Sequence, residues 1–324
     1  MVWQGIEGHD EIARRLGLAE SRGRLTGSYL FVGPDGVGKR TFALALARGA
    51  MCTAPRGPLT ACGDCPSCHA FTGGGHPDLE VVSKPPDRST IPLESLVGDQ
   101  EHRMRDGLCW KILLRPSLGS RRVAVILDAD ALSEEAANCL LKTLEEPPDA
   151  SIIIIVGTSF ERQLPTIRSR CQVIRFGGLK PDTLKPLLLR EHPELDEAAV
   201  AACLGAAGGS LSRAHDLIDT DVLATRRTIV DHLSRQPIQV AQLARVVNAF
   251  VESAGKEAPI RRDRLRLVLG FAIEHLRDRL KRPDRQGDQE LTLSRLTATL
   301  DAFESIDRNA NLAILCDAWA SRLH

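Results

Sequence analysis

Two hydropathy patterns divide the chain, and the first covers residues 1–178. There, short runs that are apolar at nearly every position alternate with helical patterns. A parallel strand covered by helices on both faces has this continuous apolar character. Five runs qualify as strands: Tyr29–Val32, Leu79–Val82, Val123–Leu127, Ile152–Val156 and Val173–Phe176. Their alternation with helices predicts an α/β domain built on a doubly wound, parallel, five-stranded sheet.

The second pattern begins after the fifth predicted strand, where no apolar run of comparable strength occurs. Apolar residues there recur at helical spacing, for example at Leu265, Leu269 and Leu276. Glycines within 205–209 mark a further boundary. We therefore predict three domains, an α/β domain at 1–178, a small helical domain at 179–218 and a larger helical domain at 219–324.

The charge of the chain is balanced. Its 324 residues include 42 basic and 42 acidic side chains, so the formal net charge is zero. Because phosphate binding needs a local excess of Lys and Arg, the zero charge argues against a protein that binds nucleic acid over its whole surface; any basic site must be a patch. The Arg-rich stretch 261–285 could be a DNA track, although a solvated helix face is favoured because the other face of the helix carries Leu265, Val268, Leu269 and Leu276.

No stretch predicts a membrane helix. The longest strongly apolar run, Ile152–Val156, is far shorter than the eighteen or more residues that a membrane span requires. The first five residues lack the apolar core of a signal peptide. We therefore expect a cytoplasmic protein, in which nine cysteines indicate metal binding or buried thiols before disulfides.

A glycine-rich loop joins the first predicted strand to a helix. Its sequence from Gly33 is GPDGVGKRT, and the helical run FALALA follows. Glycines let backbone amides turn onto phosphate oxygens, the helix N-terminus contributes its positive dipole end, and Lys39 reaches the terminal phosphates. We predict that ATP or ADP binds this loop through Gly33, Gly36, Gly38, Lys39, Arg40 and Thr41.

The same loop lacks parts that hydrolysis needs. The residue after the lysine should be Ser or Thr, whose hydroxyl is a magnesium ligand, but it is Arg40. Thr41 cannot substitute, because one helical step turns its side chain about 100° away. If Asp128 after the third strand binds the metal, Ala129 stands at the catalytic-carboxylate position; if Asp128 is that carboxylate, Leu127 stands at the metal-binding position. Either register predicts a nearly inert site.

Four cysteines between the first helix and the second strand have the spacing of a zinc site. They are Cys52, Cys62, Cys65 and Cys68. The last three form two overlapping C-x2-C turns, and the first lies at the helix end. Four protein ligands leave no open coordination position, so the predicted zinc is structural; redox thiols are the alternative. His69 and His76 could replace a ligand, although exposed loop histidines are the favoured interpretation.

A further signature surrounds the fourth strand. The segment LSEEAANCLLKTLEEPP starts at Leu132, and the segment LPTIRSRC starts at Leu164. Together with the loop and the cysteines, these segments resemble the AAA+ family of bacterial sliding-clamp loader subunits of DNA polymerase III, most closely its delta-prime branch. The resemblance covers residues 1 to about 215.

The resemblance implies an AAA+ module, made of a RecA-like domain and a helical lid, and a helical collar at 219–324 that joins five subunits into a ring. It implies that Arg170 reaches the γ-phosphate held by a neighbouring motor subunit and that Arg213 in the lid contacts bound nucleotide. In the family register Leu127 replaces the metal-binding Asp, so Asp128 follows it in the nucleotide site. Delta-prime subunits often carry such a defective phosphate loop.

The implied function is a largely non-hydrolysing subunit of the DNA polymerase III holoenzyme. Its implied partners are the gamma/tau motor and delta subunits, the sliding clamp and primed DNA, and Arg170 would serve its neighbour, although a surface salt bridge is the usual fate of a loop arginine. An active gamma/tau-like motor ATPase is the alternative, against which Arg40 and Leu127 argue. A zinc-dependent DNA-binding adaptor is a further alternative, against which the neutral charge argues.

Overall fold

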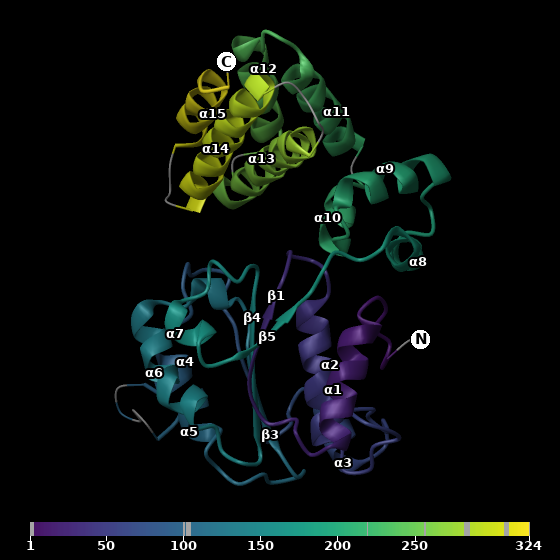
Figure 1. Ribbon diagram of the computed structural model, residues 1–324, viewed down its shortest axis with the longest axis vertical. Helices are drawn as coiled ribbons and strands as arrows, with labels where there is room; N and C mark the ends of the chain where they lie inside the picture. Colours follow the sequence, from purple (N-terminus) through teal and green to yellow (C-terminus); the bar gives the residue numbers. More distant parts are fainter. Residues whose placement is uncertain are drawn as a thin grey trace. The chain divides into compact units, whose positions relative to one another are not determined.

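The computed structural model describes residues 3–99, 101, 105–218, 220–255, 257–281, 286–307 and 311–323. The chain divides into two compact units, residues 1–215 and 216–324. The first contains a parallel sheet with helices on its faces, and the second is helical throughout its described residues, as Figure 1 shows. The three-domain division expected from the sequence, with a boundary near residue 178, stays a prediction.

The sheet of the first unit has five parallel strands in the order β2-β3-β4-β1-β5. They are β1 (Gly27–Val32), β2 (Leu79–Val82), β3 (Arg122–Ile126), β4 (Ser151–Gly157) and β5 (Gln172–Arg175). β1 lies between two neighbours, and its Leu30 is opposite Ile155 on one side and Val173 on the other. The predicted doubly wound sheet is confirmed, with each strand within two residues of its expected bounds.

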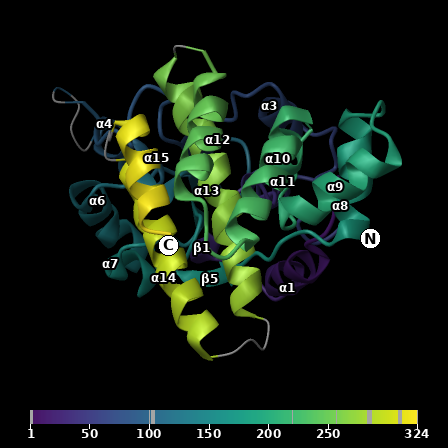
Figure 2. The same ribbon diagram turned by 90° about the horizontal axis from the view of Figure 1, so that it is seen from above.

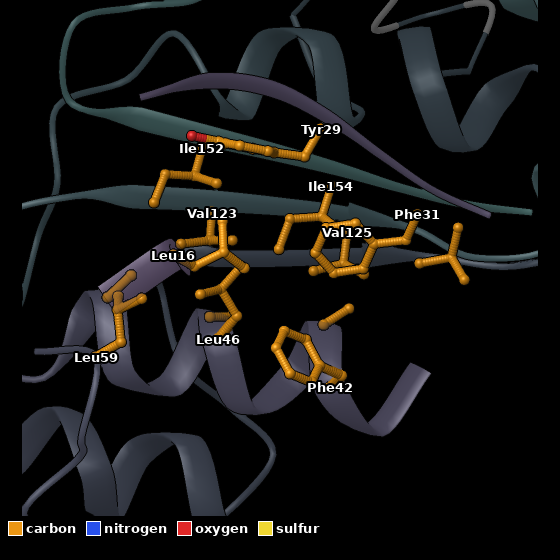
Figure 3. Packing of buried hydrophobic residues seen from close by; sticks show 14 of the residues in the cluster. Leu16, Tyr29, Phe31, Phe42, Leu46, Leu59, Val123, Val125, Ile152 and Ile154 are labelled. Carbon is orange, nitrogen blue, oxygen red and sulfur yellow. The ribbon is translucent and has the colours of Figure 1, made fainter. Parts of the chain in front are cut away.

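Helices cover both faces of the sheet. Up to the end of β5 they are α1 (Asp10–Ser21), α2 (Lys39–Met51), α3 (Pro66–Thr72), α4 (Glu94–Val97), α5 (Leu108–Lys111), the 3-10 turn η1 (Ala129–Ala131), α6 (Glu134–Glu145) and α7 (Pro165–Arg168). Phe31 faces α1 and α2 and packs with Phe42 and Leu46, as Figure 3 shows. The next side chain along the strand points the other way, so Leu30 packs with Leu140 of α6. Burying each such side chain stabilises the fold by about 1.5–3 kcal/mol.

Three helices follow the last strand within or at the end of the first unit. They are α8 (Pro181–Glu191), α9 (Glu197–Ala207) and α10 (Leu211–Asp216). A backbone hydrogen bond from Leu179 to the carbonyl oxygen of Gly209, 2.8 Å long, joins the segment before α8 to the segment before α10. The glycines there allow the two backbones to touch, because a Cβ on Gly178 would lie 2.7 Å from the carbonyl oxygen of Gly208.

The described residues of the second unit form the helices α11 (Thr220–Ser234), α12 (Val240–Glu252), α13 (Ala258–Leu280), α14 (Gln286–Asp307) and α15 (Leu312–Ser321). Figure 2 shows them from above, and α13 packs against α11, α12 and α14. Leu265, Leu269 and Leu276 of α13 are buried, as the helical spacing predicted. The buried Trp319 donates its indole N–H to Thr299 Oγ1 at 3.0 Å. Across the described part of both units, no helix is long and apolar enough to cross a membrane.

The Arg-rich stretch 261–285 lies mainly on α13. Arg264 donates to the carbonyl oxygen of Phe250 at 3.2 Å and lies over that aromatic ring, and Arg266 pairs with Asp263 at 2.6 Å. Arg264 and Arg266 thus contact residues of their own unit, and the role of the stretch, as a DNA track or a solvated helix face, stays a prediction. Arg282 and Arg285, which belong to the same stretch, lie outside the described residues.

Candidate nucleotide and metal sites at the two ends of helix α2

The glycine-rich loop lies at the carboxyl end of a central strand. β1 ends at Val32 and α2 begins at Lys39. The loop therefore lies at the carboxyl ends of the strands, where ligands bind in parallel α/β folds. Gly38 forms the N-cap of α2 in the left-handed conformation, with φ 94°. Gly33 approaches another backbone, because a Cβ there would lie 2.2 Å from the carbonyl oxygen of Phe176. The loop therefore requires glycine at these positions for its shape.

Contacts with distant segments hold the loop in place. Leu211, the first residue of α10, donates its backbone N–H to the carbonyl oxygen of Gly36 at 2.9 Å. His9 Nε2 lies 2.7 Å from the carbonyl oxygen of Val37, and because a carbonyl only accepts, Nε2 carries the proton and donates. Sequence reasoning missed His9, since nothing in its local pattern indicates a partner 28 residues away.

Lys39 turns back onto the loop itself. Its side chain is buried, and Nζ donates to the carbonyl oxygens of Gly33 and Pro34 at 2.7 and 2.6 Å. Burial lowers the pKa of this ammonium group, and the carboxylates of Asp35 and Asp130 oppose that shift. The Asp35 carboxylate also accepts the N–H of Gly36 at 2.9 Å. Both the lysine and one loop amide thus have partners within the loop.

The residues after the lysine face another direction. Arg40 and Thr41 are exposed and line a cavity of about 270 Å³ on the outer side of α2. The cavity extends to Arg48 in the same helix and Phe71 in α3, and Lys39 is not among its lining residues. The Arg40 side chain therefore lines a different cavity from the Lys39 side chain, which would contact phosphate.

The end of β3 separates the two residues that the sequence analysis weighed as metal or catalytic positions, Leu127 and Asp128, from a third residue that it did not consider, Asp130. Leu127 is buried in the apolar cluster on the α2 side of the sheet. Asp128 is exposed in the left-handed conformation, and its Oδ2 accepts the backbone N–H of Lys84 at 3.2 Å. Asp130 turns inward and accepts the N–H of Thr158 at 2.9 Å. The inward carboxylate is thus Asp130, and a nucleotide-binding role for Asp128 stays a prediction.

Arg170 lies just after α7 and has partners within the chain. Nε donates to Glu145 Oε1, the last residue of α6, at 2.6 Å, and Nη2 also pairs with that carboxylate. Nη1 donates to the carbonyl oxygen of Thr166 at 3.0 Å and to Ser169 Oγ at 3.1 Å. The side chain is 29% exposed. A role toward a neighbouring subunit would require it to leave Glu145.

Arg213 lies on the helix that contacts the loop. Its backbone N–H donates to Ser210 Oγ at 3.2 Å, which caps the start of α10. Ser210 and Ser212 also flank Gly36, because a Cβ there would lie 2.3 Å from Ser210 Oγ. The structure thus brings the beginning of α10 to the loop, while nucleotide contact by Arg213 stays a prediction.

The four predicted cysteine ligands meet at the other end of α2. Cys52 is the C-cap of α2, and Cys65 is the N-cap of α3. All four Sγ atoms lie within 4.8 Å of one another, and the distances from Cys52 to Cys62, Cys65 and Cys68 are 3.6, 3.8 and 3.7 Å. Zinc–sulfur bonds of about 2.3 Å in a tetrahedron separate sulfur atoms by about 3.8 Å. The cluster could therefore hold a metal ion.

Backbone amides surround the cluster. The N–H groups of Cys62, Cys65 and Cys68 each donate to a neighbouring Sγ at 3.3–3.4 Å. Burial raises the pKa of Cys52 to about 12. Burial would also raise the pKa of Cys65, but hydrogen bonds from Thr53 and Cys68 lower it to about 5. A divalent cation at the centre would hold all four sulfurs as thiolates, so the donor set fits zinc.

The two nearby histidines differ in burial. His69 is exposed, as expected, but the same expectation is wrong for His76, which is buried. Its Nδ1 accepts the N–H of Asp78 at 3.0 Å, so Nε2 donates to Ser67 Oγ at 2.8 Å. The Ser67 hydroxyl in turn donates to the carbonyl oxygen of Met51 at 2.8 Å. His76 therefore braces the segment around the cysteines without entering the cluster.

Asp78 holds the loop that contains residues 117–119. The sequence analysis did not predict this role. The buried Asp78 carboxylate accepts the N–H groups of Ser117, Leu118 and Gly119 at 2.6, 2.8 and 3.1 Å and lies 3.5 Å from Arg122 Nη2. Burial would raise the pKa of Asp78, but the three amide donors and the guanidinium lower it. The carboxylate therefore stays ionised in the folded protein.

These features define a class of protein. A glycine-rich loop at the carboxyl end of a central parallel strand, leading into a helix and holding a buried lysine, is the arrangement of P-loop nucleotide-binding folds. Residues 8–180 match the family model described as DNA polymerase III, delta subunit. The chain belongs to this family, which confirms the membership expected from its motifs.

Named relatives agree with this assignment. The delta' subunit of DNA polymerase III from Pseudomonas aeruginosa is 32% identical over 227 residues, which are 68% of this chain and 66% of that protein. The gamma/tau subunit from Mycobacterium bovis is 33% identical over 211 residues, 63% of this chain and 34% of that protein. The matched region spans less than two thirds of either relative. A gamma subunit-related protein of Thermotoga maritima aligns over 97% of this chain and 98% of its own, with TM-score 0.49 and 15% identity.

Proposed function

We propose that the protein is a largely non-hydrolysing delta-prime subunit of the DNA polymerase III clamp loader, which helps to load the sliding clamp on primed DNA. Family membership supports the class. The observation that carries the lack of hydrolysis is Leu127, which is buried among apolar side chains where the family register has a metal-binding carboxylate. Hydrolysis depends on positioning and charge stabilisation around magnesium, so such a site turns ATP over slowly or not at all.

The contacts of the phosphate loop support the same proposal. Nucleotide phosphates would have to replace the two carbonyl oxygens that Lys39 contacts and the Asp35 carboxylate at the N–H of Gly36. Binding of ATP or ADP is therefore weak in this proposal. Arg40, on the outer side of α2, offers no hydroxyl for magnesium. The double substitution Arg40→Thr and Leu127→Asp would recover magnesium binding without restoring full ATPase activity.

The proposed contribution to catalysis is made in trans. Arg170 would leave Glu145 and reach the γ-phosphate held by a neighbouring gamma/tau motor subunit. Leaving would break the partly exposed ion pair with Glu145, a kind of pair worth about 0–1 kcal/mol, and the hydrogen bonds to Thr166 and Ser169. A guanidinium supplied to a transferring phosphoryl group accelerates hydrolysis by about 10³–10⁵. The proposed acceleration of hydrolysis therefore outweighs the free energy lost when the ion pair between Arg170 and Glu145 is broken.

The cysteine cluster is proposed to hold one structural zinc ion. Its four sulfurs close the coordination shell and leave no position for substrate. The helical residues 179–218 and 219–324 are proposed as the lid and as the collar, which joins five subunits with delta and gamma/tau in a ring. The sliding clamp and primed DNA are partners of that whole assembly.

An active motor ATPase is the second candidate, favoured by the 33% identity to a gamma/tau subunit. Steady-state ATP hydrolysis by the purified chain separates the two functions. The non-hydrolysing proposal expects no turnover above background, and Lys39→Ala should leave the rate of the assembled loader nearly unchanged. Lysine-dependent hydrolysis by the unmutated chain alone would establish the motor and refute the proposal.

Arg170→Ala tests the contribution in trans. In a ring reconstituted with the mutant chain, assembly should persist while ATP hydrolysis by the motor subunits falls, most strongly with clamp and primed DNA present. Arg170→Lys should not restore the rate, because an ammonium lacks the planar fork that bridges phosphate oxygens. Arg168→Ala is the matched control, since Arg168 stacks over Phe160 at 4.7 Å in the same segment. An unchanged rate in a complete Arg170→Ala ring would identify Arg170 as a surface charge.

A further inference from the structure

Two histidines from different helices of the first unit face each other. His192 follows the C-terminus of α8, and His215 lies in α10. Their ring centroids are 5.0 Å apart, and His192 Nε2 lies 3.0 Å from His215 Nδ1. The two side chains are 31% and 29% exposed, so solvent reaches the pair.

A carboxylate holds the outer nitrogen of each ring. His192 Nδ1 lies 3.1 Å from Glu194 Oε1, and His215 Nε2 lies 2.9 Å from Glu191 Oε2. Carboxylates only accept hydrogen bonds, so each outer nitrogen carries a proton. A neutral imidazole has one N–H and one lone pair. When both rings are neutral, the two inner nitrogens present lone pairs to each other at 3.0 Å, and a cation between them, a proton or a metal ion, removes the repulsion.

Other cations on α8 have carboxylate partners of their own. Lys185 Nζ lies 3.7 Å from Glu197, and Arg190 Nη2 lies 2.9 Å from Glu7. Glu191 and Glu194 therefore remain directed at the histidines, and their two negative charges flank the two rings. This electrostatic environment attracts a small cation to the inner nitrogens.

We propose that His192 Nε2 and His215 Nδ1 bind one divalent transition-metal ion, with water completing its coordination. Imidazole nitrogen suits zinc, copper and nickel. Metal–nitrogen bonds of about 2.0–2.1 Å across the observed separation enclose an angle of about 95°, which is that of neighbouring ligands in octahedral or square-planar coordination. Histidine ligands commonly donate their second N–H to a carboxylate, and both histidines here do so.

The site would couple two elements of the helical segment. A shared metal ion joins the end of α8 to α10, and the first residue of α10 hydrogen-bonds to the phosphate loop. Metal binding should therefore slow amide exchange in α10 and at the end of α8. Exchange within the central strands, which have their own buried cores, should not change.

Nickel titration of the full chain tests the site. The protein is prepared without an affinity tag and with one equivalent of zinc per chain, so that the tighter cysteine site is occupied and the histidines are not, and Ni²⁺ binding is followed by calorimetry and by broadening of histidine ring resonances. One additional ion should bind per chain. His192→Ala or His215→Ala should weaken binding at least about 10-fold, and Glu191→Gln about 10-fold, the usual effect of losing a carboxylate behind a ligand. His275→Ala, in the second unit, should have no effect.

Two results would overturn the proposal. One is nickel affinity that stays unchanged in both histidine variants while their unfolding curves match the wild type. The other is a pair that holds a shared proton, visible in the ring nitrogen shifts, and fails to take up nickel at equimolar concentration. Circular dichroism of each variant excludes loss of fold as the reason for any lost binding.

Discussion

The two ends of α2 present opposite chemical situations. At the C-terminal end, four sulfur atoms lie at the separations of a tetrahedral metal site and accept backbone N–H groups. At the N-terminal end, the phosphate loop keeps its backbone shape, with Arg40 exposed and Leu127 buried at the two positions where the proposed function expects polar metal ligands to be missing. One helix thus carries a complete set of ligands and an incomplete one.

This difference shows what maintains each site. The loop is held by contacts that do not involve magnesium, namely the hydrogen bonds from His9 and Leu211 and the close approach of Gly33 to Phe176. Its shape can therefore persist after its catalytic ligands are lost. The cysteine segment is also held by contacts of its own, from Ser67 to Met51 and to His76, but there the four side chains of the predicted ligand set are all present as well.

Removing the metal should produce the largest effect at the C-terminal end. Zinc affinities in small sites correspond to about 10–16 kcal/mol, so the ion should survive dialysis and require a strong chelator. After chelation, amide exchange in 52–68 should rise sharply while the strands stay protected by their own core. Metal analysis should give one zinc per chain, none in Cys65→Ser, and an unchanged value in the control Cys139→Ser. Purified protein with no metal and four freely titrating thiols would contradict this.

Gly49→Ala should also disrupt this end more than the other. A Cβ at Gly49 of α2 would lie 2.2 Å from the carbonyl oxygen of Leu59, which is backbone and cannot move aside as a side chain can. Overpacking of this kind costs about 1–3 kcal/mol, and we expect the upper part of that range in urea unfolding.

The matched control for Gly49→Ala is Gly17→Ala in α1. There the new Cβ would lie 3.6 Å from Pro58, an ordinary contact, and alanine favours the helix by about 1 kcal/mol. Gly17→Ala should therefore leave stability equal or raised. Equal stability of the two variants would show that the cysteine segment does not rest on α2 as described.

The strands, the glycine-rich loop and the four cysteines that form both sites could be predicted from the sequence. Strands apolar at nearly every position could be located, and the loop and the cysteines have spacings that depend on local chain geometry. The supporting residues could not be predicted, because their roles arise from contacts between distant segments. His9 reaches Val37, and Asp78 collects three amides about 40 residues away. No local sequence pattern around a single His or Asp indicates hydrogen-bond partners so far away in the chain.

Asp78 makes the stability of the cysteine end depend on pH. Its folded-state pKa is lowered, whereas the unfolded value is about 3.9, so its contribution is present above about pH 4 and is lost as pH falls through the folded value. Asp78→Asn should cost about 1.5–3 kcal/mol at pH 7 and flatten the acid side of the stability curve. Glu11→Gln, which breaks the exposed pair with Arg14, should leave stability and the acid side of the curve unchanged. Parallel acid curves for Asp78→Asn and wild type would contradict this.

Glu145→Gln should have the smallest effect on folding and bears on whether Arg170 is free to act elsewhere. The Glu145 side chain is 48% exposed, and its ion pair with Arg170 contributes about 0–1 kcal/mol to stability. Glu145 also ends α6, where the helix dipole disfavours a negative charge by about 0.3–1 kcal/mol. The two effects oppose each other, so the melting temperature should stay nearly unchanged.

In a reconstituted ring, Glu145→Gln should keep or raise the rate of ATP hydrolysis by the motor, because Arg170 no longer has to leave a carboxylate. Glu146→Gln is the control, since it alters the charge at the same helix end but not the residue that Arg170 contacts. If Glu145→Gln lowers stability by well over 1 kcal/mol, the ion pair serves the fold. Arg170 would then be part of the structure that holds α6 to α7, and the division between a catalytic contribution in trans and an inert site in cis would fail.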